Sequence, residues 1–325
     1  MRALALFACA TVSGAAMQVL VTGAGGRTGS LVFSQLKHET EHDSIEPVGL
    51  ARSKRALKAL RKAGATREEI IRADATQSKE SLVSAMRGCE GVVLCTSAVP
   101  SIRPLSLVKL LFTKYVRRSA GGRPAFKFAR GGTPEEVDWL GAKLQIDAAV
   151  EAGVKRFVFV SSMGGSPNVK GKLVSGKLEF SRPENFLNTI GRRPDGTGGD
   201  ILLWKRKAER YLIESGLTYT IIHPGGLVDE PPSARELVVG VDDEMLQLQS
   251  RSVARADVAR VCCAALVEPA AANKSFDLAS REVGVGTPTR DARSVFATLG
   301  ARTCDYGQDE PDPPSIFAGA STSVG

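Results

Sequence analysis

The chain has 325 residues, of which 43% are hydrophobic and 24% are charged. This composition excludes a disordered chain, and the length allows one large domain or two smaller ones with a sizeable core. The net charge is +8, and eight basic residues without any acid lie between 101 and 134, so the rest of the chain is close to neutral. We therefore expect a globular protein with one local basic stretch and no nucleic-acid partner.

The first 16 residues form an apolar, small-residue run that ends in Ser13-Gly14-Ala15-Ala16. Such a run is typical of a short signal-like or targeting segment, and it is too short to span a membrane. The alternative is a disordered or wrongly assigned start before Met17. The sequence leaves the localisation open between the cytoplasm and a plastid. The six cysteines have no metal-ligand spacing, so we expect reduced thiols and no metal.

A glycine-rich turn follows the first predicted strand, Val19 to Val21, and a helical pattern begins after it. One glycine permits the sharp turn, one lets a pyrophosphate approach the backbone, and one lets the helix pack close to the sheet. The N–H groups at the start of that helix then face the phosphates. An ordinary glycine turn is the alternative. The sequence predicts a dinucleotide site here, formed by Gly23, Gly26, Arg27, Thr28 and Gly29.

The second predicted strand, 45–50, is followed by Arg52, Ser53 and Lys54, where an NAD-binding fold usually has an acidic residue. Cations at the start of a helix are disfavoured by its dipole unless an anion binds there. This favours NADP over NAD, with Arg52 and Ser53 at the 2′-phosphate. A third strand, 70–73, leads to Asp74 and Ala75, which we place at the adenine. A turn or capping role is the alternative for Asp74.

The fourth predicted strand, 91–95, has no polar interruption, as expected in a parallel sheet that is buried on both faces. The small residues Thr96, Ser97 and Ala98 follow it, where a cofactor could pass. The basic stretch comes next, and 104–118 has the pattern of a basic amphipathic helix. Contact with a membrane surface or a protein is one interpretation, and packing on the protein's own surface is the other.

The second half continues the alternation of strands and helices. We predict strands at 156–160, 217–222 and 276–278 and helices at 133–151, 203–215, 235–249, 255–266 and 291–299. The segment 166–200 is too long for a simple connection and is expected to be a functional lid. A disordered tail is expected from 301 to 325. Residues that follow two of the strands complete the predicted cofactor site: Val160, Ser161, Pro224 and Gly225.

Several motifs resemble the atypical short-chain dehydrogenase/reductase family, and in particular its NmrA-like plant and algal NADP-binding Rossmann proteins. The resemblance covers about residues 17–299. It implies an α/β fold with a doubly wound parallel sheet in one Rossmann domain, 17–300, and a small C-terminal substrate lobe at the carboxyl ends of the strands. The motifs are Val19-Leu20-Val21-Thr22-Gly23, Thr96-Ser97-Ala98-Val99-Pro100, Gly121-Gly122-Arg123-Pro124, Val137-Asp138-Trp139, Ser162-Met163-Gly164-Gly165, Trp204-Lys205-Arg206-Lys207-Ala208-Glu209 and Arg255-Ala256-Asp257-Val258-Ala259.

The chain departs from this family at the catalytic tyrosine. Members that reduce carbonyls use Tyr-x-x-x-Lys, in which the lysine also orients the nicotinamide ribose. Lys205 matches that lysine, but Ile201 stands in the place of the tyrosine. The nearest tyrosines in sequence are Tyr211 and Tyr219. Tyr211 is predicted to face the wrong turn of a helix and Tyr219 to lie on a strand, so neither is an obvious substitute.

Two further side chains are candidates for chemistry. Ser162 matches the family's serine, which could bond a substrate carbonyl, although capping the next turn is the alternative. His223 follows a strand near the expected nicotinamide and could act as an acid or base. A histidine bonded only to a backbone partner is the alternative. The candidate catalytic residues are thus Ser162, Lys205 and His223.

Two functions fit these features. One is an NADP-dependent oxidoreductase that acts on an unidentified small molecule without the usual tyrosine. The other is a non-catalytic NADP(H) redox sensor or scaffold, which Ile201 favours. The cofactor loop and Lys205 are compatible with both.

Overall fold

A computed structural model describes residues 16–38, 45–102, 104–106, 112, 125–166, 173–174, 177–178, 186–194 and 197–307. Its centre is an eight-stranded sheet of order β12-β14-β10-β7-β4-β1-β2-β3. All neighbouring strands are parallel except β12 and β14, which are antiparallel. The doubly wound parallel sheet that the sequence predicts is therefore confirmed.

The strands of this sheet are short and mostly buried. Their bounds are β1 Met17–Thr22, β2 Ile45–Leu50, β3 Ile70–Ile71, β4 Gly91–Leu94, β7 Arg156–Val160, β10 Tyr219–Pro224, β12 Leu237–Gly240 and β14 Lys274–Ser280. Two-stranded pairs lie outside it: β5 Ser101–Ile102 with β6 Phe126–Lys127, β8 Leu173–Val174 with β9 Lys177–Leu178, and β11 Gly226–Val228 with β13 Ser252–Ala254.

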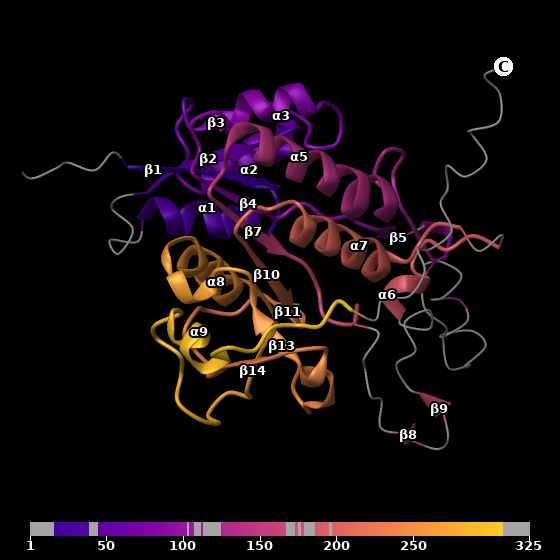
Figure 1. The fold of residues 1–325 in the computed structure, drawn as a ribbon. Helices are drawn as coiled ribbons and strands as arrows, with labels where there is room; N and C mark the ends of the chain where they lie inside the picture. The colour runs from indigo at the N-terminus through magenta and orange to yellow at the C-terminus, as the bar shows by residue number, and fades with distance from the viewer. Residues whose placement is uncertain are drawn as a thin grey trace, which may run out of the picture.

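Helices cover both faces of the sheet (Figure 1). One buried cluster joins it to α1 Gly29–His38, α2 Lys54–Lys62, α8 Arg255–Val267 and α9 Ser294–Leu299. The other joins it to α3 Lys79–Met86, α5 Ala142–Ala152 and α7 Ile201–Glu214. Shorter helices are α6 Phe186–Thr189 and the 3₁₀ turns η4 Glu244–Gln247 and η5 Pro269–Ala271. Because the strands are parallel, their carboxyl ends share one edge of the sheet, where the predicted site residues gather.

The predicted helix over 133–151 is divided in the structure. Its first part, η2 Glu135–Gly141, is π-helical, and α5 continues directly from it. Thr133 and Glu136 form a reciprocal cap at its start, with the Thr133 N–H donating to Glu136 Oε2 at 3.0 Å and the Glu136 N–H donating to Thr133 Oγ1 at 3.3 Å. π-Helical turns are frequent at functional sites.

The predicted helix over 235–249 is wrong. Leu237–Gly240 instead forms the antiparallel edge strand β12, and only Glu244–Gln247 is helical. Asp242 and Asp243 lie between β12 and this short helix, and their left-handed φ angles of 54° and 63° turn the chain there. The β-branched pair Val238-Val239 favours a strand, and pairing with β14 overrides the local helical pattern.

The disordered tail predicted from residue 301 is wrong for its first residues. Cys304 is buried, its N–H donates to Ser275 O at 2.8 Å, and Tyr306 packs against the second cluster. Residues 308–325 lie outside the described residues, as do 1–15 and most of the predicted lid and of the basic helix 104–118. Within the described residues, no helix has the length and apolar character needed to cross a membrane.

Candidate functional site

The glycine turn between β1 and α1 lies against the end of β4. Gly23 has a φ of +64°, and a Cβ there would lie 2.7 Å from the carbonyl carbon of Cys95. A Cβ at Gly29 would lie 2.3 Å from Gly23 O, so these two glycines fix the turn and the close start of α1. Arg27, beside the turn, pairs with Asp229 just after β11. Thr28 O accepts from the N–H groups of Leu31 and Val32 at 3.0 Å and so begins the helix.

The predicted 2′-phosphate site is an open pocket of about 510 Å³ beside the ends of β2 and β3. Arg52 and Ser53, which the sequence placed at the 2′-phosphate, line it together with Arg72 and with Asp74, which the sequence placed at the adenine. Arg72 was missed because it lies beside the two-residue strand β3, where sequence spacing gives no signal. Ser53 also caps α2 by accepting from the Ala56 N–H at 3.2 Å. Asp74 makes the turn contact that the alternative interpretation expected, because it accepts from the Thr76 N–H at 3.0 Å, and it also pairs with Arg52 at 3.5 Å.

The small residues after β4 are held by two buried side chains of the helix that follows. The Ala98 N–H donates to Asp138 Oδ2 at 3.0 Å, and Gln145 Nε2 donates to Thr96 Oγ1 at 3.2 Å. Asp138 also pairs with Lys205 Nζ through Oδ1 at 2.9 Å, and both side chains are at most 5% exposed. Lys205, the predicted lysine on α7, is thus held by Asp138, a carboxylate of the π-helical turn η2. In the sequence, Asp138 stood out only as part of the motif Val137-Asp138-Trp139.

The two nearby tyrosines lie away from Ile201 and Lys205, or are engaged elsewhere. The Tyr211 hydroxyl donates to Asp147 at 2.6 Å, and its ring packs edge-on against Trp139 with centroids 5.7 Å apart. Tyr219 begins β10, at the edge of the sheet opposite to the glycine turn. Ile201 begins α7, one turn before Lys205.

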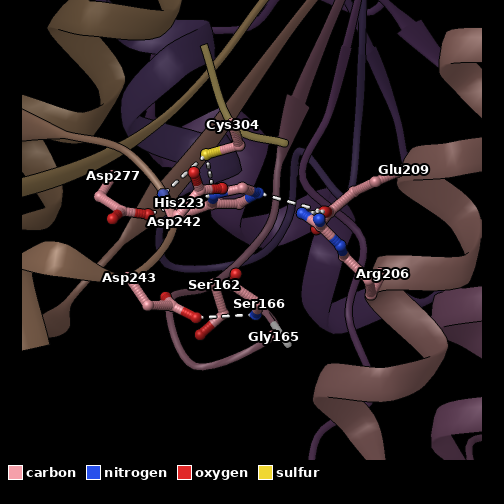
Figure 2. Close-up of a pocket in the computed structure, with 10 residues that line it drawn as sticks. All are labelled: Ser162, Gly165, Ser166, Arg206, Glu209, His223, Asp242, Asp243, Asp277 and Cys304. Carbon is pink, nitrogen blue, oxygen red and sulfur yellow. Dashed lines mark hydrogen bonds and ion pairs between the residues drawn. The ribbon is translucent and has the colours of Figure 1, made fainter. Parts of the chain in front are cut away.

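A buried polar network lies beside Ser162 (Figure 2). Its centre is Glu209 on α7, which accepts from the hydroxyl of Ser161 and lies 3.2 Å from His223 Nε2. On the other side, His223 Nδ1 lies 3.3 Å from Asp277 Oδ1, its register partner on β14. His223 is therefore held by side chains and not by a backbone partner.

Opposite charges shift the pKa values of this network. Burial alone would raise the pKa of Glu209, but the charge of His223, a hydrogen bond from it and Arg206 lower that pKa to about 2. Burial alone would likewise lower the pKa of His223, but Glu209 and Asp277 hold it well above 6.5. The network therefore holds an imidazolium between two carboxylates.

Residues 304–306, which follow α9, complete the network. The Tyr306 hydroxyl donates to Glu209 Oε2 at 2.9 Å, and the guanidinium of Arg206 lies 3.4 Å from the centre of the Tyr306 ring. Cys304 Sγ lies 3.8 Å from His223 Nδ1. His223, Asp277 and Cys304 place ligand-type atoms within 4.8 Å of one another in the part of the chain that is described. Their contacts with one another and with Glu209 account for this arrangement, so we interpret it as a charge network.

The segment after Ser162 is held by a second buried carboxylate. Asp243 accepts from the N–H groups of Gly164 at 2.6 Å and Ser166 at 2.7 Å. Burial and the neighbouring charge of Asp277 raise its pKa to about 6. Ser162 is half-buried and lines the small hollow next to Glu209 and His223. Its hydroxyl donates to Met163 O at 3.2 Å, so it makes a local turn contact of the kind that the alternative interpretation expected.

The remaining predicted residues lie at the same edge of the sheet. Val160 and Ala75 are buried, the Ser161 N–H donates to Ile222 O at 2.8 Å, and the Gly225 N–H donates to Leu278 O at 2.9 Å. Pro224 ends β10. The strands therefore bring the glycine turn, the cationic pocket, Lys205 and the polar network together along one edge.

A family model described as NAD(P)H-binding matches residues 23–269. The chain belongs to this NAD(P)H-binding family. The match covers the sheet from the glycine turn to the end of α8, and together with the relatives below it places the protein among the atypical short-chain dehydrogenases/reductases, as the motifs suggested.

Relatives of this NAD(P)H-binding protein include a reductase. It is 43% identical over 293 residues to an uncharacterised chloroplastic protein of Arabidopsis thaliana, covering 89% of this chain and 78% of the relative. It is 38% identical over 290 residues to sanguinarine reductase of Eschscholzia californica, and the match covers 87% of this chain and 96% of the relative. Among solved structures, an oxidoreductase from Lactococcus lactis matches with a TM-score of 0.56 and 17% identity over 87% and 96% of the two chains, which supports the fold.

Proposed function

We propose that the protein is an NADP(H)-dependent reductase of a small organic molecule. The observation that carries this proposal is the pairing of Lys205 with Asp138 at the end of β4, beside the glycine turn. A buried lysine at this edge can bond the hydroxyls of a nicotinamide ribose and fix the ring for hydride transfer. The bound cofactor would supply the hydride. A reductase among the full-length relatives supports the same chemistry.

The preference for NADP rests on the cationic pocket. Arg52 and Arg72 line it, and the carboxylate that faces them, Asp74, is already engaged in a turn and an ion pair. The ion pair of Asp74 is with Arg52 itself, at 3.5 Å, and because the Arg52 side chain is 57% exposed its guanidinium can turn from Asp74 to a phosphate. A guanidinium binds a phosphate through charge-assisted hydrogen bonds.

Arg52→Ala is expected to weaken NADPH binding by about tenfold or more, because one charge-assisted contact contributes about 1.5 to 3 kcal/mol. Binding of NADH should stay within about twofold. Titration calorimetry of both cofactors measures the difference. The matched control is Arg55→Ala, an exposed arginine in the first turn of α2, the helix that follows Arg52, and it is not among the residues lining the pocket. An equal loss for the two cofactors would contradict a role in 2′-phosphate recognition.

Reduction also needs a proton, and no tyrosine of the described residues pairs with Lys205. We assign the polarising role to Ser162 and the proton supply to the hollow that it shares with His223 and Glu209. His223 carries a proton at neutral pH because its pKa lies well above 6.5.

Ile201→Tyr tests whether the missing tyrosine limits the reaction. Residues four apart lie on one face of a helix, so the phenol would stand one turn from Lys205. General acid catalysis contributes about 10² to 10⁴ in rate. NADPH oxidation with a panel of quinones and aldehydes should therefore accelerate. Ile201→Phe is the control, since it adds the ring without the hydroxyl. A fast wild-type reaction that neither variant changes would point to a different proton donor and would exclude a non-catalytic role.

The second candidate function is a non-catalytic NADP(H) sensor or scaffold. The absence of a phenol in the first turn of α7 favours it. In this case both the wild-type protein and the Ile201→Tyr variant would bind NADPH without oxidising it. Chloroplastic relatives favour a plastid location over the cytoplasm for either function.

A further inference from the structure

A cavity of about 530 Å³ lies next to the start of α7, and the mechanism above does not use it. Its walls come from β6, α6 and the segment that leads into α7. In Figure 1, α6 lies beyond the first turn of α7 and next to β5. A volume of this size accommodates a small organic molecule.

The cavity is fixed to the helix that carries Lys205. Asn188 on α6 accepts from the Leu202 N–H through its side chain at 2.9 Å, and its backbone oxygen accepts from the Asp200 N–H at 2.8 Å. A Cβ at Gly199 would lie only 2.5 Å from Asn188 O, so the two segments are in close backbone contact. A ligand in the cavity would therefore lie beside the first turn of α7.

The cavity lining combines aromatic rings with positive charge. Phe126 and Phe186 pack edge to face with ring centroids 6.3 Å apart, and the edge of the Phe128 ring packs against Gly191. Aromatic side chains of this kind provide surfaces on which a flat ring can stack.

Three cations line the same cavity, and none of its lining residues within the described part of the chain is an acid. Arg192 is neutralised by the buried carboxylate of Asp200. Lys127 and Arg193 are exposed and have no acidic partner among the residues that the structure describes. Their charge favours an anionic group on the ligand and disfavours a cationic one.

We propose that this cavity binds the substrate and that the substrate is a planar aromatic carbonyl compound or quinone with a negatively charged group. This inference rests on the proposed reductase function. For a quinone, a hydride from C4 of NADPH and one proton give the hydroquinone and NADP⁺, which balances two electrons and two hydrogens. The aromatic walls hold the ring, and Lys127 and Arg193 bind the anionic group.

The test compares two ligands that differ only in charge. Anthraquinone-2-carboxylate and anthraquinone-2-carboxamide are titrated into the NADP⁺-loaded protein by calorimetry, and their reduction by NADPH is followed by absorbance. The wild-type protein should bind the carboxylate about tenfold or more tightly than the carboxamide and should reduce it with a correspondingly lower KM.

The double variant Lys127→Gln/Arg193→Gln should remove this preference and leave carboxamide and NADPH binding unchanged. Arg87→Gln, which removes an exposed charge in the turn before β4 at the far edge of the sheet, should change nothing. Phe128→Leu should weaken both ligands. Equal affinity of the wild-type protein for the two ligands, or a preference that survives the double variant, would overturn the assignment.

The two proposals fail in different ways. Tight, charge-dependent binding of the carboxylate without any NADPH oxidation would overturn the substrate role of the cavity and the reductase function together, while NADPH binding would persist. Oxidation of NADPH by both anthraquinones at the same KM would support the reductase and overturn only the charge selectivity.

Discussion

Gly26→Val is expected to abolish NADP(H) binding while the protein stays folded. A Cβ at Gly26 meets only Gly23 O, at 3.0 Å, so the turn itself can nearly accommodate a side chain there. The valine would instead fill the space through which a pyrophosphate reaches the backbone N–H groups. Because several charge-assisted hydrogen bonds would be lost together, the Kd should rise by about a hundredfold or more. Calorimetric titration with NADPH measures this.

The neighbouring glycine provides the contrast. A Cβ at Gly29 would lie 2.3 Å from Gly23 O, so Gly29→Ala should weaken cofactor binding and destabilise the fold at once. Unfolding of Gly26→Val by urea should instead stay within about 1 kcal/mol of wild type. Unchanged NADPH affinity in Gly26→Val would mean that the loop is only a turn.

Glu209→Gln is expected to destabilise the protein by about 3 to 5 kcal/mol, because it removes the charge from one side of a buried ion pair. Glu209 is 2% exposed, and its carboxylate faces His223, Arg206 and the hydroxyls of Ser161 and Tyr306. The amide would leave the two cations without that counter-charge. Urea unfolding measures the change. Glu214→Gln, at the exposed end of the same helix, is the control and should stay within about 0.5 kcal/mol.

The same network predicts how stability depends on pH. The folded pKa of Glu209 is about 2, below its ordinary 4.5, so its contribution is complete above pH 4.5 and is lost as the pH falls towards 2. His223 has a folded pKa raised above 6.5, so its contribution is complete below pH 6.5 and is lost as the pH rises through that raised pKa. The difference between wild type and Glu209→Gln should shrink below pH 4.5. A difference that stays constant from pH 7 to pH 3 would contradict this account.

The sheet could be predicted from the sequence because its signals are local. The runs around Val21, Val93 and Phe159 are short, apolar and bounded by turn residues, and β2 and β7 have the predicted bounds. The edge strand β12 was missed because its strand state depends on pairing with β14, a long-range contact.

The sequence carries a clear signal for the proposed cofactor side, whereas of the polar network it singled out Ser162 and His223 but not the carboxylates around them. The glycines and Arg52 stand at fixed distances along the chain from a strand, so their spacing carries the signal. Glu209, Asp277 and Tyr306 come from three elements that are far apart in sequence, and each reads as an ordinary surface residue by itself. The available sign in the sequence was a carboxylate four residues after Lys205 together with a histidine near the end of a strand.

The π-helical turn η2 makes the site sensitive to insertions and deletions of a single residue. A π-turn holds about one residue more than an α-turn, and each residue of an α-helix rotates the chain by about 100°. Deleting one residue between Asp138 and α5 would convert the turn to α-helix and rotate Asp138 away from both Lys205 and the Ala98 N–H. In chains of this fold that are one residue shorter in the segment of η2, the lysine that matches Lys205 would thus lack this carboxylate partner. This would hold even where every other motif residue is the same.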